Sequence, residues 1–319
     1  MIMKISIILP IFNEEKNLPL LFASLYEVIG GLGCGYEIIA VDDHSKDKSL
    51  EVLRELAKKD KNVKVISFRV NGGQTAALSA GIAAASGGLM IPMDSDMEND
   101  PKDIPKLIDK LDEGYDVVSG WRKDRWNGGF VTRLKRRLPS ACANWLISKI
   151  TKVKLHDYGC ILKVYKADVL KGVALYGEMH RFIPAYASWR GAKVAELPVN
   201  YQARRFGKSN YGMSRTFRVL LDLVTIKFFD KYMNRPMHFF GGIGFATSSL
   251  GILAGLAAIL LKVMHIRDFV ATPLPIFSAM LVIVGVQLVA MGVVAEMLMR
   301  TYYESQGKKP YIIAETINL

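Results

Sequence analysis

The sequence predicts an α/β protein in which a mostly parallel, doubly wound sheet is followed by two membrane-spanning helices. Short apolar runs alternate with helical patterns through the first half of the chain. These runs are apolar rather than alternating with polar residues, which is typical of strands that helices cover on both faces. Near the C-terminus, two long segments carry almost no ionisable residue. The alternation predicts the sheet, and the two apolar segments predict the membrane helices.

The predicted strands of the first half each end close to a polar or turn-forming residue. They cover residues 5–9, 37–41, 63–68, the apolar run from 89 to 93, and 115–120. Apolar residues at helical spacing predict helices between them at 17–29, 49–59, 74–85 and 104–111. Pro10 is expected to end the first strand, and Asp42 and Asp43 the second. Strands separated by helices of this length pair in parallel.

The overall composition restricts the class of partner. The 319 residues carry a formal net charge of +12, which suggests an anionic partner such as nucleic acid, anionic lipid or a phosphorylated substrate. No stretch interleaves Lys or Arg with aromatic residues, so no nucleic-acid partner is expected. The cysteines Cys34, Cys142 and Cys160 form no C-x-x-C pair, which argues against a zinc site and a disulfide framework. The N-terminal residues do not resemble a signal peptide.

Two carboxylates, Asp94 and Asp96, follow the fourth predicted strand. Side chains two residues apart on a strand point the same way, so both acids can face one crevice at the carboxyl end of the sheet. Paired carboxylates suit Mg²⁺ or Mn²⁺, with the phosphates of a substrate completing the coordination shell. The D-x-D therefore indicates a site for a nucleoside diphosphate, and a solvated acidic turn is the alternative.

The second half of the chain has a different character. A basic cluster at 133–137 opens a predicted helix that runs towards residue 150. Residues 214–235 form a predicted amphipathic helix with Phe217, Leu220, Leu221, Val224, Phe228 and Phe229 on its apolar side. Because this helix leads directly into an apolar segment, we expect it to lie at a membrane interface. An ordinary helix packed on a core is the alternative.

The two apolar segments cover residues 236–261, where only His238 is potentially charged, and 273–294, which has no ionisable residue. Each exceeds the about 20 residues that cross a hydrocarbon core. A buried helical hairpin in a soluble protein is the alternative.

An even number of spans puts both termini on one side of the membrane. That side carries Arg204, Arg205, Lys208, Lys227, Lys231, Arg235, Arg300, Lys308 and Lys309. The loop between the spans offers only Lys262 and Arg267 besides His265. The positive-inside rule therefore predicts a multi-pass protein of the inner or plasma membrane with its large domain in the cytoplasm. The tail at 309–315 has strand character, and it is expected either to pair with a neighbouring protomer or to fray.

Several short motifs in a fixed order resemble glycosyltransferase family 2, whose members have the GT-A fold. They are Pro10-Ile11-Phe12-Asn13-Glu14, then Val41-Asp42-Asp43-His44-Ser45-Lys46-Asp47, then the D-x-D. The segments at 71–78 and 156–163, with two C-terminal spans, resemble the polyprenyl-phosphate glycosyltransferases within that family. The resemblance implies a cytoplasmic GT-A catalytic domain at 1–213, an interfacial helix at 214–235, a transmembrane hairpin at 236–299 and a cytoplasmic tail at 300–319.

The resemblance also implies where a nucleotide-sugar donor binds. It would contact Pro10, Asn13, Glu14, Asp42, Gln74, Asp94, Ser95, and a mobile loop that contains Arg205 and Lys208. Asp94 and Asp96 would hold the Mg²⁺ or Mn²⁺ that bridges the two phosphates. Gln74 is expected either to cap its helix or to touch the donor, and Asp43 either to contribute to the site or to serve as a turn or cap residue.

The acceptor implied by the resemblance is a lipid monophosphate, a polyprenyl phosphate in the bilayer. Its phosphate would be held by Arg122, Arg136, Ser140 and Arg181. Surface arginines near a membrane are the alternative for Arg136, and a packing role is the alternative for His180. Asp157 would lie near the reacting carbon of the sugar, where it orients a hydroxyl, polarises the acceptor or acts as a weak base. Asp157 and Asp96 are the predicted catalytic residues.

The main functional hypothesis is an inverting, metal-dependent transfer of one hexose, glucose from UDP-glucose, to undecaprenyl phosphate in cell-envelope glycan biosynthesis. A dolichyl- or polyprenyl-phosphate mannose synthase that uses GDP-mannose is an alternative. A membrane-anchored scaffold without activity is another, against which the intact Asp94, Asp96 and Asp157 argue. A processive synthase would need more spans and a Q-x-x-R-W motif. The membrane hairpin and the tail favour a homo-oligomer, a dimer or tetramer.

Overall fold

The computed structural model describes residues 4–123, 125, 138–171, 173, 179–202, 236–304 and 313–319. The predicted basic cluster at 133–137, the helix at 214–235, and Arg136, Arg205 and Lys208 lie outside the described residues. Contacts divide the chain into two compact units, one made of Met1–Asp222 with Lys309–Leu319 and the other of Leu223–Lys308. The domain boundaries expected at 213, 235 and 299 stay predictions.

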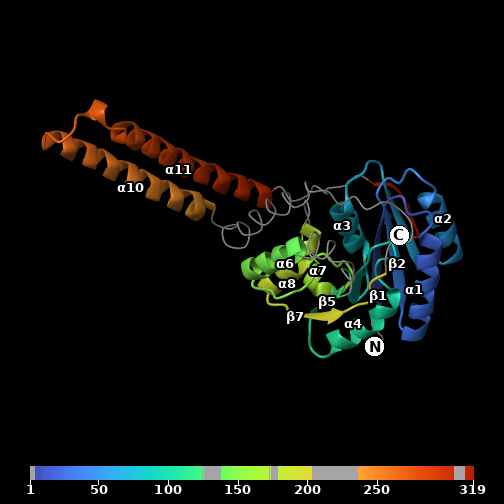
Figure 1. The fold of residues 1–319 in the computed structure, drawn as a ribbon. Coiled ribbons are helices and arrows are strands. Elements are labelled where there is room, and N and C mark those ends of the chain that lie inside the picture. The colour runs from blue at the N-terminus through green and yellow to red at the C-terminus, as the bar shows by residue number, and fades with distance from the viewer. Residues whose placement is uncertain are drawn as a thin grey trace. The chain divides into compact units, whose positions relative to one another are not determined.

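The described part of the first unit contains an eight-stranded sheet in the order β7-β5-β6-β4-β1-β2-β3-β8 (Figure 1). The predicted parallel core is confirmed, because β1 pairs in parallel with both β2 and β4, and β2 pairs with β3. The bounds of these strands are β1 Ile5–Ile11, β2 Tyr36–Asp42, β3 Val63–Phe68 and β4 Leu89–Pro92. The crossovers are α1 Leu18–Leu32, α2 Ser49–Lys59, α3 Gln74–Ala84 and, after β4, α4 Ile104–Asp112.

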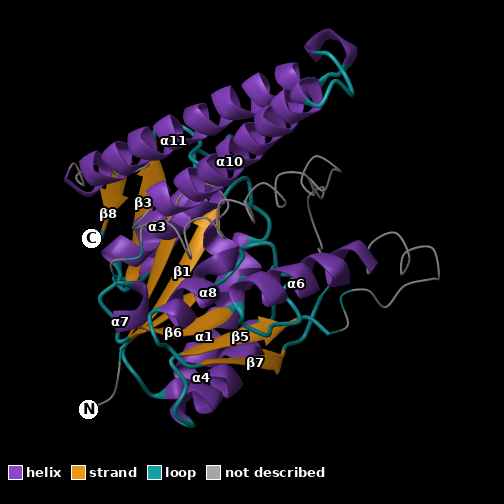
Figure 2. Cartoon of the chain, turned by 90° about the vertical axis from the view of Figure 1, so that its left-hand side faces the viewer, coloured by secondary structure: helices purple, strands orange, loops and turns teal. Residues whose placement is uncertain are grey.

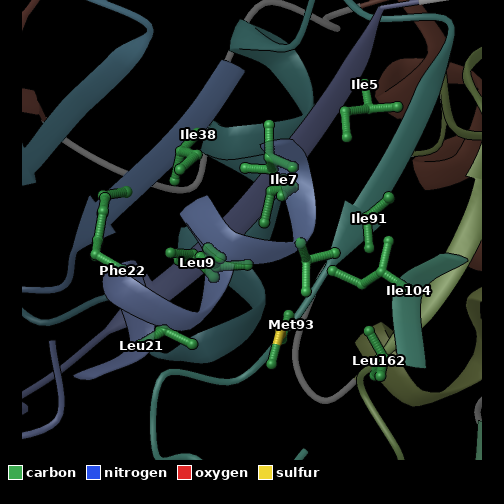
Figure 3. Packing of buried hydrophobic residues seen from close by; sticks show 14 of the residues in the cluster. Ile5, Ile7, Leu9, Leu21, Phe22, Ile38, Ile91, Met93, Ile104 and Leu162 are labelled. Atoms are coloured by element: carbon green, nitrogen blue, oxygen red, sulfur yellow. The ribbon is translucent and has the colours of Figure 1, made fainter. Parts of the chain in front are cut away.

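Helices cover both faces of the sheet because successive strand residues point to opposite sides. On one face, Ile5, Ile7 and Leu9 of β1 pack with residues of α1, α2 and α4, including Leu21 and Phe22 (Figure 3). On the other face, Ile8 packs with residues of α3 and with the helix α8 Ile183–Trp189. Each such side chain removed from water contributes roughly 1.5–3 kcal/mol. The all-apolar strands thus form the middle layer of three.

Three further strands extend the sheet beyond β4, and of these only β5 was predicted. They are β5 Val117–Trp121, β6 Lys163–Lys166 and β7 Val194–Pro198. β6 lies between β4 and β5 and is antiparallel to both, whereas β5 and β7 are parallel. The helices α6 Leu138–Thr151 and α7 Ala167–Leu170 flank β6 in the sequence. The antiparallel β6 places the turn that precedes it at the same end of the sheet as the D-x-D.

The prediction that Pro10 ends the first strand is wrong, because β1 continues to Ile11. In a parallel strand, the N–H and C=O of alternate residues point to the same neighbour. Met93 N–H donates to the carbonyl of Ile8, and Asp43 N–H donates to the carbonyl of Ile11. The backbone N–H and C=O groups of even-numbered β1 residues therefore point towards β4, and those of odd-numbered residues towards β2. Since β4 ends at Pro92, the missing N–H of Pro10 costs no ladder bond. Pro10 is therefore tolerated within β1, because its backbone points to the side where β4 has already ended.

The C-terminal tail forms β8 Ile313–Ile317, which pairs antiparallel with β3 of the same chain (Figure 2). Arg54 donates to both carboxylate oxygens of Glu315, and the Asn318 amide donates to the carbonyls of Ala57 and Val63. The predicted strand character is confirmed. Of the two expectations for its fate, pairing with a neighbouring protomer or fraying, the described residues follow neither.

The second unit contains the helical hairpin α10 Pro236–Val263 and α11 Leu274–Glu304. Phe239–Val263 and Leu274–Ala295 are long and apolar enough to cross a membrane, and only 17% and 11% of their most apolar windows are buried. That exposure argues against the alternative of a buried hairpin in a soluble protein. Gly244 and Gly285 allow the two helices to touch, since a Cβ on Gly244 would lie 2.6 Å from the Gly285 carbonyl oxygen.

Candidate active site

The loops that follow β1, β2 and β4 each contain a non-glycine residue with left-handed backbone. These residues are Asn13 at φ 59°, His44 at φ 60° and Met97 at φ 62°. Asn and His tolerate this conformation, but for Met it is uncommon and is typical of a functional site held by its surroundings. The first two loops are joined directly, because Ser45 Oγ accepts from Asn13 N–H at 3.0 Å and Asn13 Oδ1 accepts from Lys46 N–H at 2.7 Å.

Asp42, at the end of β2, is only 1% exposed. Its carboxylate accepts hydrogen bonds from Ser67 Oγ at 3.0 Å and Ser45 N–H at 3.2 Å. Glu14 is tied to the same region, because its N–H donates to Ser49 Oγ at 2.8 Å and its carboxylate accepts from Asn17 Nδ2. These bonds shape the two predicted donor loops. The contacts of Asp42, Asn13 and Glu14 with a donor stay predictions.

Asp43 caps the N-terminus of α3. Its carboxylate accepts from the N–H groups of Gly72 at 2.6 Å and Gly73 at 2.9 Å, and from Asn71 Nδ2 at 2.9 Å. Gly73 has φ 82°, which a side chain would strain. Burial raises the pKa of Asp43, although the two backbone bonds oppose that shift. Of the two expectations for Asp43, the structure supports the turn or cap role, because the carboxylate binds the N–H groups of the two glycines that lead into α3.

The D-x-D follows β4 and is held from three directions. Gln74 Nε2, in the first turn of α3, donates to Asp94 Oδ1 at 2.7 Å. Ser95 Oγ donates to the Pro10 carbonyl at 2.9 Å, and Glu98 N–H donates to Asp96 Oδ1 at 3.0 Å. Gly73 holds the N-cap position of α3, and the Gln74 side chain is directed to Asp94; contact of Gln74 with a donor stays a prediction. These contacts bring the ends of β1, β4 and α3 together at one point.

The donor set suits a divalent cation, provided that a ligand contributes further oxygens. In the described part of the chain no group of three or more His, Cys, Asp or Glu forms a complete metal cage. Mg²⁺ is commonly bound by only one or two carboxylates together with substrate phosphates and water. The hydrogen bonds at Asp94 Oδ1 and Asp96 Oδ1 orient the two carboxylates. The residues present therefore fit a metal that binds together with a nucleoside diphosphate.

Asp157 and Arg122 form a buried ion pair beside the D-x-D. Arg122 donates from Nε to Asp157 Oδ2 at 2.8 Å and from Nη2 to Oδ1 at 3.2 Å, and its Nη1 lies 3.5 Å from Glu98 Oε2. Burial alone would raise the pKa of Asp157, but the charge and hydrogen bonds of Arg122 hold that pKa below its usual range. Asp157 is therefore ionised at neutral pH. Arg122 is 4% exposed, and the acceptor role predicted for it stays a prediction.

Glu196 of β7 supports the Asp157 turn, and no local motif predicted it. Its Oε1 accepts from the N–H of Asp157 at 3.0 Å and of His156 at 2.9 Å, and its Oε2 lies 2.7 Å from His156 Nδ1. The His156 ring stacks on Trp121 of β5 with centroids 4.4 Å apart. One carboxylate thus fixes the backbone on which Asp157 stands. An isolated Glu in a short strand carries no motif by which it could have been found.

Beneath these acids lie two buried basic side chains. His180 Nδ1 is 2.8 Å from Thr75 Oγ, and burial, helped by the charges of Arg181 and Lys163, lowers the pKa of His180 to about 3. His180 is therefore neutral, and the packing alternative for it is supported. Lys163 of β6 is 2% exposed and donates to the Cys160 carbonyl, and burial lowers its pKa. Lys163 was not predicted as part of the site.

Of three further predicted acceptor residues, the structure describes the position of two. Arg181 lies in the 3-10 turn Met179–Phe182, next to His180. Ser140 lies in the first turn of α6, although its side chain is not described, and Arg136 lies outside the described residues. The structure thus brings together Pro10, Ser95, Gln74, Asp94 and Asp96 on one side and Arg122 and Asp157 on the other.

Sequence comparison identifies the family. The model for "Glycosyl transferase family 2" matches residues 6–173. The chain belongs to glycosyltransferase family 2. It is 40% identical to a dodecaprenyl-phosphate galacturonate synthase of Rhizobium johnstonii, over 98% of this chain and 93% of the relative. It is 32% identical to an undecaprenyl-phosphate 4-deoxy-4-formamido-L-arabinose transferase of Shewanella sediminis, over 98% and 92%.

Solved structures confirm the predicted GT-A fold for this family 2 glycosyltransferase. Mannosyl-3-phosphoglycerate synthase from Rubrobacter xylanophilus matches with a TM-score of 0.54 at 14% identity, over 71% of this chain and 74% of that chain. Glucosyl-3-phosphoglycerate synthase from Mycobacterium tuberculosis, solved with Mn²⁺, UDP-glucose and phosphoglyceric acid, matches with a TM-score of 0.52 at 19% identity, over 72% and 79%. At these identities the likeness concerns the fold alone.

Proposed function

We propose that this glycosyltransferase moves one sugar from a nucleoside diphosphate donor to a polyprenyl phosphate. The observation that carries the proposal is the link through Glu98 between the two acidic centres. Glu98 N–H binds Asp96 Oδ1 at 3.0 Å, and Glu98 Oε2 lies 3.5 Å from Arg122, which holds Asp157. The carboxylates suited to a diphosphate thus adjoin the ionised carboxylate suited to the sugar. The full-length relatives named for polyprenyl-phosphate chemistry support the acceptor class.

Asp94 and Asp96 would hold Mg²⁺ or Mn²⁺ together with the donor diphosphate. When bound, the ion supplies Lewis-acid stabilisation of the departing nucleoside diphosphate. Gln74 fixes Asp94, and Ser95 anchors the turn to Pro10, so the two carboxylates keep their position. Crystal structures of neighbours with the same fold that contain Mn²⁺ or Mg²⁺ with a uridine nucleotide support this assignment. Asn13, Glu14 and Asp42 would contact the nucleoside, and Arg205 and Lys208 the phosphates.

The acceptor phosphate is anionic at neutral pH, so its oxygen needs little deprotonation before it attacks. The remaining tasks are to bring two anions together and to orient them. Arg136, Ser140 and Arg181 would hold the acceptor phosphate. Asp157, kept ionised by Arg122, would orient a sugar hydroxyl near the reacting carbon. Arg122 could reach the acceptor only by giving up part of its pairing with Asp157 and Glu98. In-line attack would invert the configuration and give a β-linked product.

Two sugars are candidates for the donor. Glucose from UDP-glucose was the expectation from family resemblance. A hexuronic acid is the second candidate, favoured by the 40% identity to a galacturonate synthase over 98% of the chain. Mannose from GDP-mannose is a further outcome of the test described below.

We also propose that the hairpin crosses the inner or plasma membrane, that the catalytic unit is cytoplasmic, and that the protein works as a homodimer or homotetramer.

The decisive experiment uses the full chain in lipid nanodiscs with a short-chain polyprenyl phosphate. UDP-glucose, UDP-galacturonate, other UDP-sugars and GDP-mannose are supplied with Mn²⁺ or Mg²⁺, and lipid-linked product is measured by mass spectrometry. We expect one donor to be transferred, and EDTA to stop the transfer. Failure of every donor in the presence of metal would favour the scaffold hypothesis. Transfer that is unaffected by EDTA would remove the metal from the proposal.

A further inference from the structure

His156 has an exposed imidazole ring that is nevertheless held in a fixed orientation. The side chain is 69% exposed. Its ring stacks on Trp121 with centroids 4.4 Å apart and planes 19° apart, and Nδ1 lies 2.7 Å from Glu196 Oε2. Ordering a surface side chain costs conformational entropy that a single exposed contact seldom repays. A polar ring that is fixed by two neighbours and otherwise open to solvent is suited to bind a ligand.

The backbone of His156 is fixed as well, by two elements that lie far apart in the sequence. Its N–H donates to both carboxylate oxygens of Glu196 on β7, at 2.9 and 3.0 Å. Its carbonyl accepts from Asn144 Nδ2 of α6 at 2.6 Å. The next residue is Asp157, the carboxylate of the proposed active site, which is 9% exposed. The ring of His156 therefore stands at the surface of that site, one residue from its buried carboxylate.

The contact with Glu196 decides which ring nitrogen can meet a ligand. A carboxylate only accepts hydrogen bonds, so Nδ1 of His156 is the nitrogen that donates to it. Within the described part of the chain, the hydrogen bonds of the ring involve Nδ1 alone. Nε2 is therefore the ring atom that can bind a ligand. When the ring is protonated, Nε2–H is a charged donor of the kind that binds phosphate, and Glu196 supplies its counter-charge.

The groups beside the ring favour an anionic ligand. Lys123 Nζ lies 5.9 Å from the centre of the Trp121 ring on which His156 stacks. The carboxylate of Glu196 already accepts from the N–H groups of His156 and Asp157, so it is directed at the backbone of the turn. A lysine on one side and an inward-directed carboxylate on the other leave positive charge at the exposed ring.

Of the two anions in the proposed reaction, the acceptor phosphate fits this position. The donor diphosphate is assigned to Asp94 and Asp96 after β4, whereas His156 is tied through Asn144 to α6. Ser140, which is proposed to hold the acceptor phosphate, lies one helical turn before Asn144. We propose that His156 is a further acceptor residue, whose Nε2–H donates a hydrogen bond to the acceptor phosphate. This assignment rests on the function proposed above.

Two substitutions separate the role of Nε2 from that of Nδ1. His156→Asn can keep a bond to Glu196 in place of Nδ1, whereas His156→Gln can carry its amide to the place of Nε2. With the full chain in nanodiscs, we expect His156→Asn to raise the KM for a short-chain polyprenyl phosphate roughly 10- to 100-fold, the loss typical of a charge-assisted hydrogen bond. His156→Gln should raise that KM less, and the donor KM should stay unchanged in both variants.

The matched control is His265→Asn, because His265 is exposed in the loop between α10 and α11 and its left-handed backbone suits Asn. It should change neither KM. An unchanged acceptor KM in His156→Asn would overturn the proposal. A rise in His156→Gln as large as that in His156→Asn would also overturn it, because Nε2 would then not be the contact. A rise in the donor KM instead would place the ring at an anionic group of the donor sugar and exclude the acceptor assignment.

Direct binding gives a second test that needs no turnover. Calorimetry with the full chain compares a short-chain polyprenyl phosphate with the corresponding polyprenol, which lacks the phosphate. We expect the unchanged protein to prefer the phosphate, and His156→Asn to reduce that preference roughly 10- to 100-fold. An undiminished preference in His156→Asn would overturn the proposal. Absence of both transfer and phosphate preference in the unchanged protein would instead contradict the proposed function.

Discussion

The carboxylate of Glu196 accepts a hydrogen bond from the backbone N–H of Asp157 at 3.0 Å. The two residues lie on different elements, Glu196 on β7 and Asp157 in the turn before β6. Because this bond holds the backbone of Asp157, the position of the proposed catalytic carboxylate depends on Glu196. Glu196 acts through Asp157, so it is a positioning residue.

Replacement of Glu196 by Gln should lower kcat about tenfold and change the donor KM little. The glutamine keeps one acceptor oxygen but loses the charge that strengthens the bonds to the N–H groups of His156 and Asp157, and bonds to charged groups are worth about 1.5–3 kcal/mol. Steady-state kinetics with the preferred donor would measure the effect. Glu55→Gln on the exposed side of α2 is the control. A purely structural role would lower the melting temperature while leaving kcat per folded molecule unchanged.

Replacement of Asp157 by Asn should lower kcat by roughly 10²–10⁴-fold, the range typical of a lost acid–base or orienting group. It should also destabilise the fold, because the Arg122 guanidinium, 4% exposed, loses its closest carboxylate. Asp112→Asn, exposed at the end of α4, should change neither property. Activity of the Asn variant close to that of the unchanged enzyme would exclude a role for Asp157 in turnover.

The same ion pair predicts a pH dependence. The pKa of Asp157 is held below its ordinary value in the folded protein, so the unfolded chain takes up the proton first as the pH falls. The stabilisation is complete above the unfolded pKa, about 3.9, and is lost as the pH drops through the folded pKa. Stability measured by denaturant titration should therefore fall more steeply below pH about 4 in the unchanged protein than in Asp157→Asn. Parallel curves would contradict the pairing.

Replacement of Asp96 by Ala should abolish transfer without unfolding the domain. The Asp96 carboxylate accepts from the N–H of Glu98, two residues further along the same turn. A lost electrostatic contact in the transition state costs roughly 10²–10³-fold or more. Calorimetry of Mn²⁺ binding in the presence of the nucleoside diphosphate would show whether the metal is lost with activity. Asp109→Ala on the outer side of α4 is the control. Full activity in Asp96→Ala would remove the metal assignment.

The sequence predicted α2 and β3 with their observed bounds, because their apolar period and their polar ends are local signals. It missed β6 and β7, since both are short and gain their partners only through the folded sheet. The D-x-D and Asp157 were found from local motifs. Glu98 follows the D-x-D directly, where the sequence suggests an added metal ligand or a solvated residue, but its pairing with Arg122 depends on tertiary contacts that no local pattern encodes. Glu196 comes from a distant position without a motif.

Glu37 tests how far the stability of the sheet can be separated from its chemistry. The residue is 1% exposed and lies at the start of β2, at the end of the sheet opposite the D-x-D. Its carboxylate accepts from Lys4 Nζ at 2.8 Å, Lys64 Nζ at 3.0 Å and Ser6 Oγ at 2.6 Å. Burial alone would raise the pKa of Glu37, but these hydrogen bonds and the Ser86 N–H hold it well below the usual range.

Replacement of Glu37 by Gln should therefore cost about 2 kcal/mol of unfolding free energy, the order of a lost charge-assisted bond, and leave kcat per folded molecule unchanged. Because the folded pKa is lowered, the contribution is complete above the unfolded pKa of about 4.3 and disappears as the pH falls further. The difference in unfolding free energy between Glu37→Gln and the unchanged protein should thus be constant from neutral pH down to about 5 and shrink below about 4. A fall in kcat per folded molecule would instead show that Glu37, at the amino end of the sheet, affects the D-x-D at the carboxyl end, some four strand residues further along the strand direction.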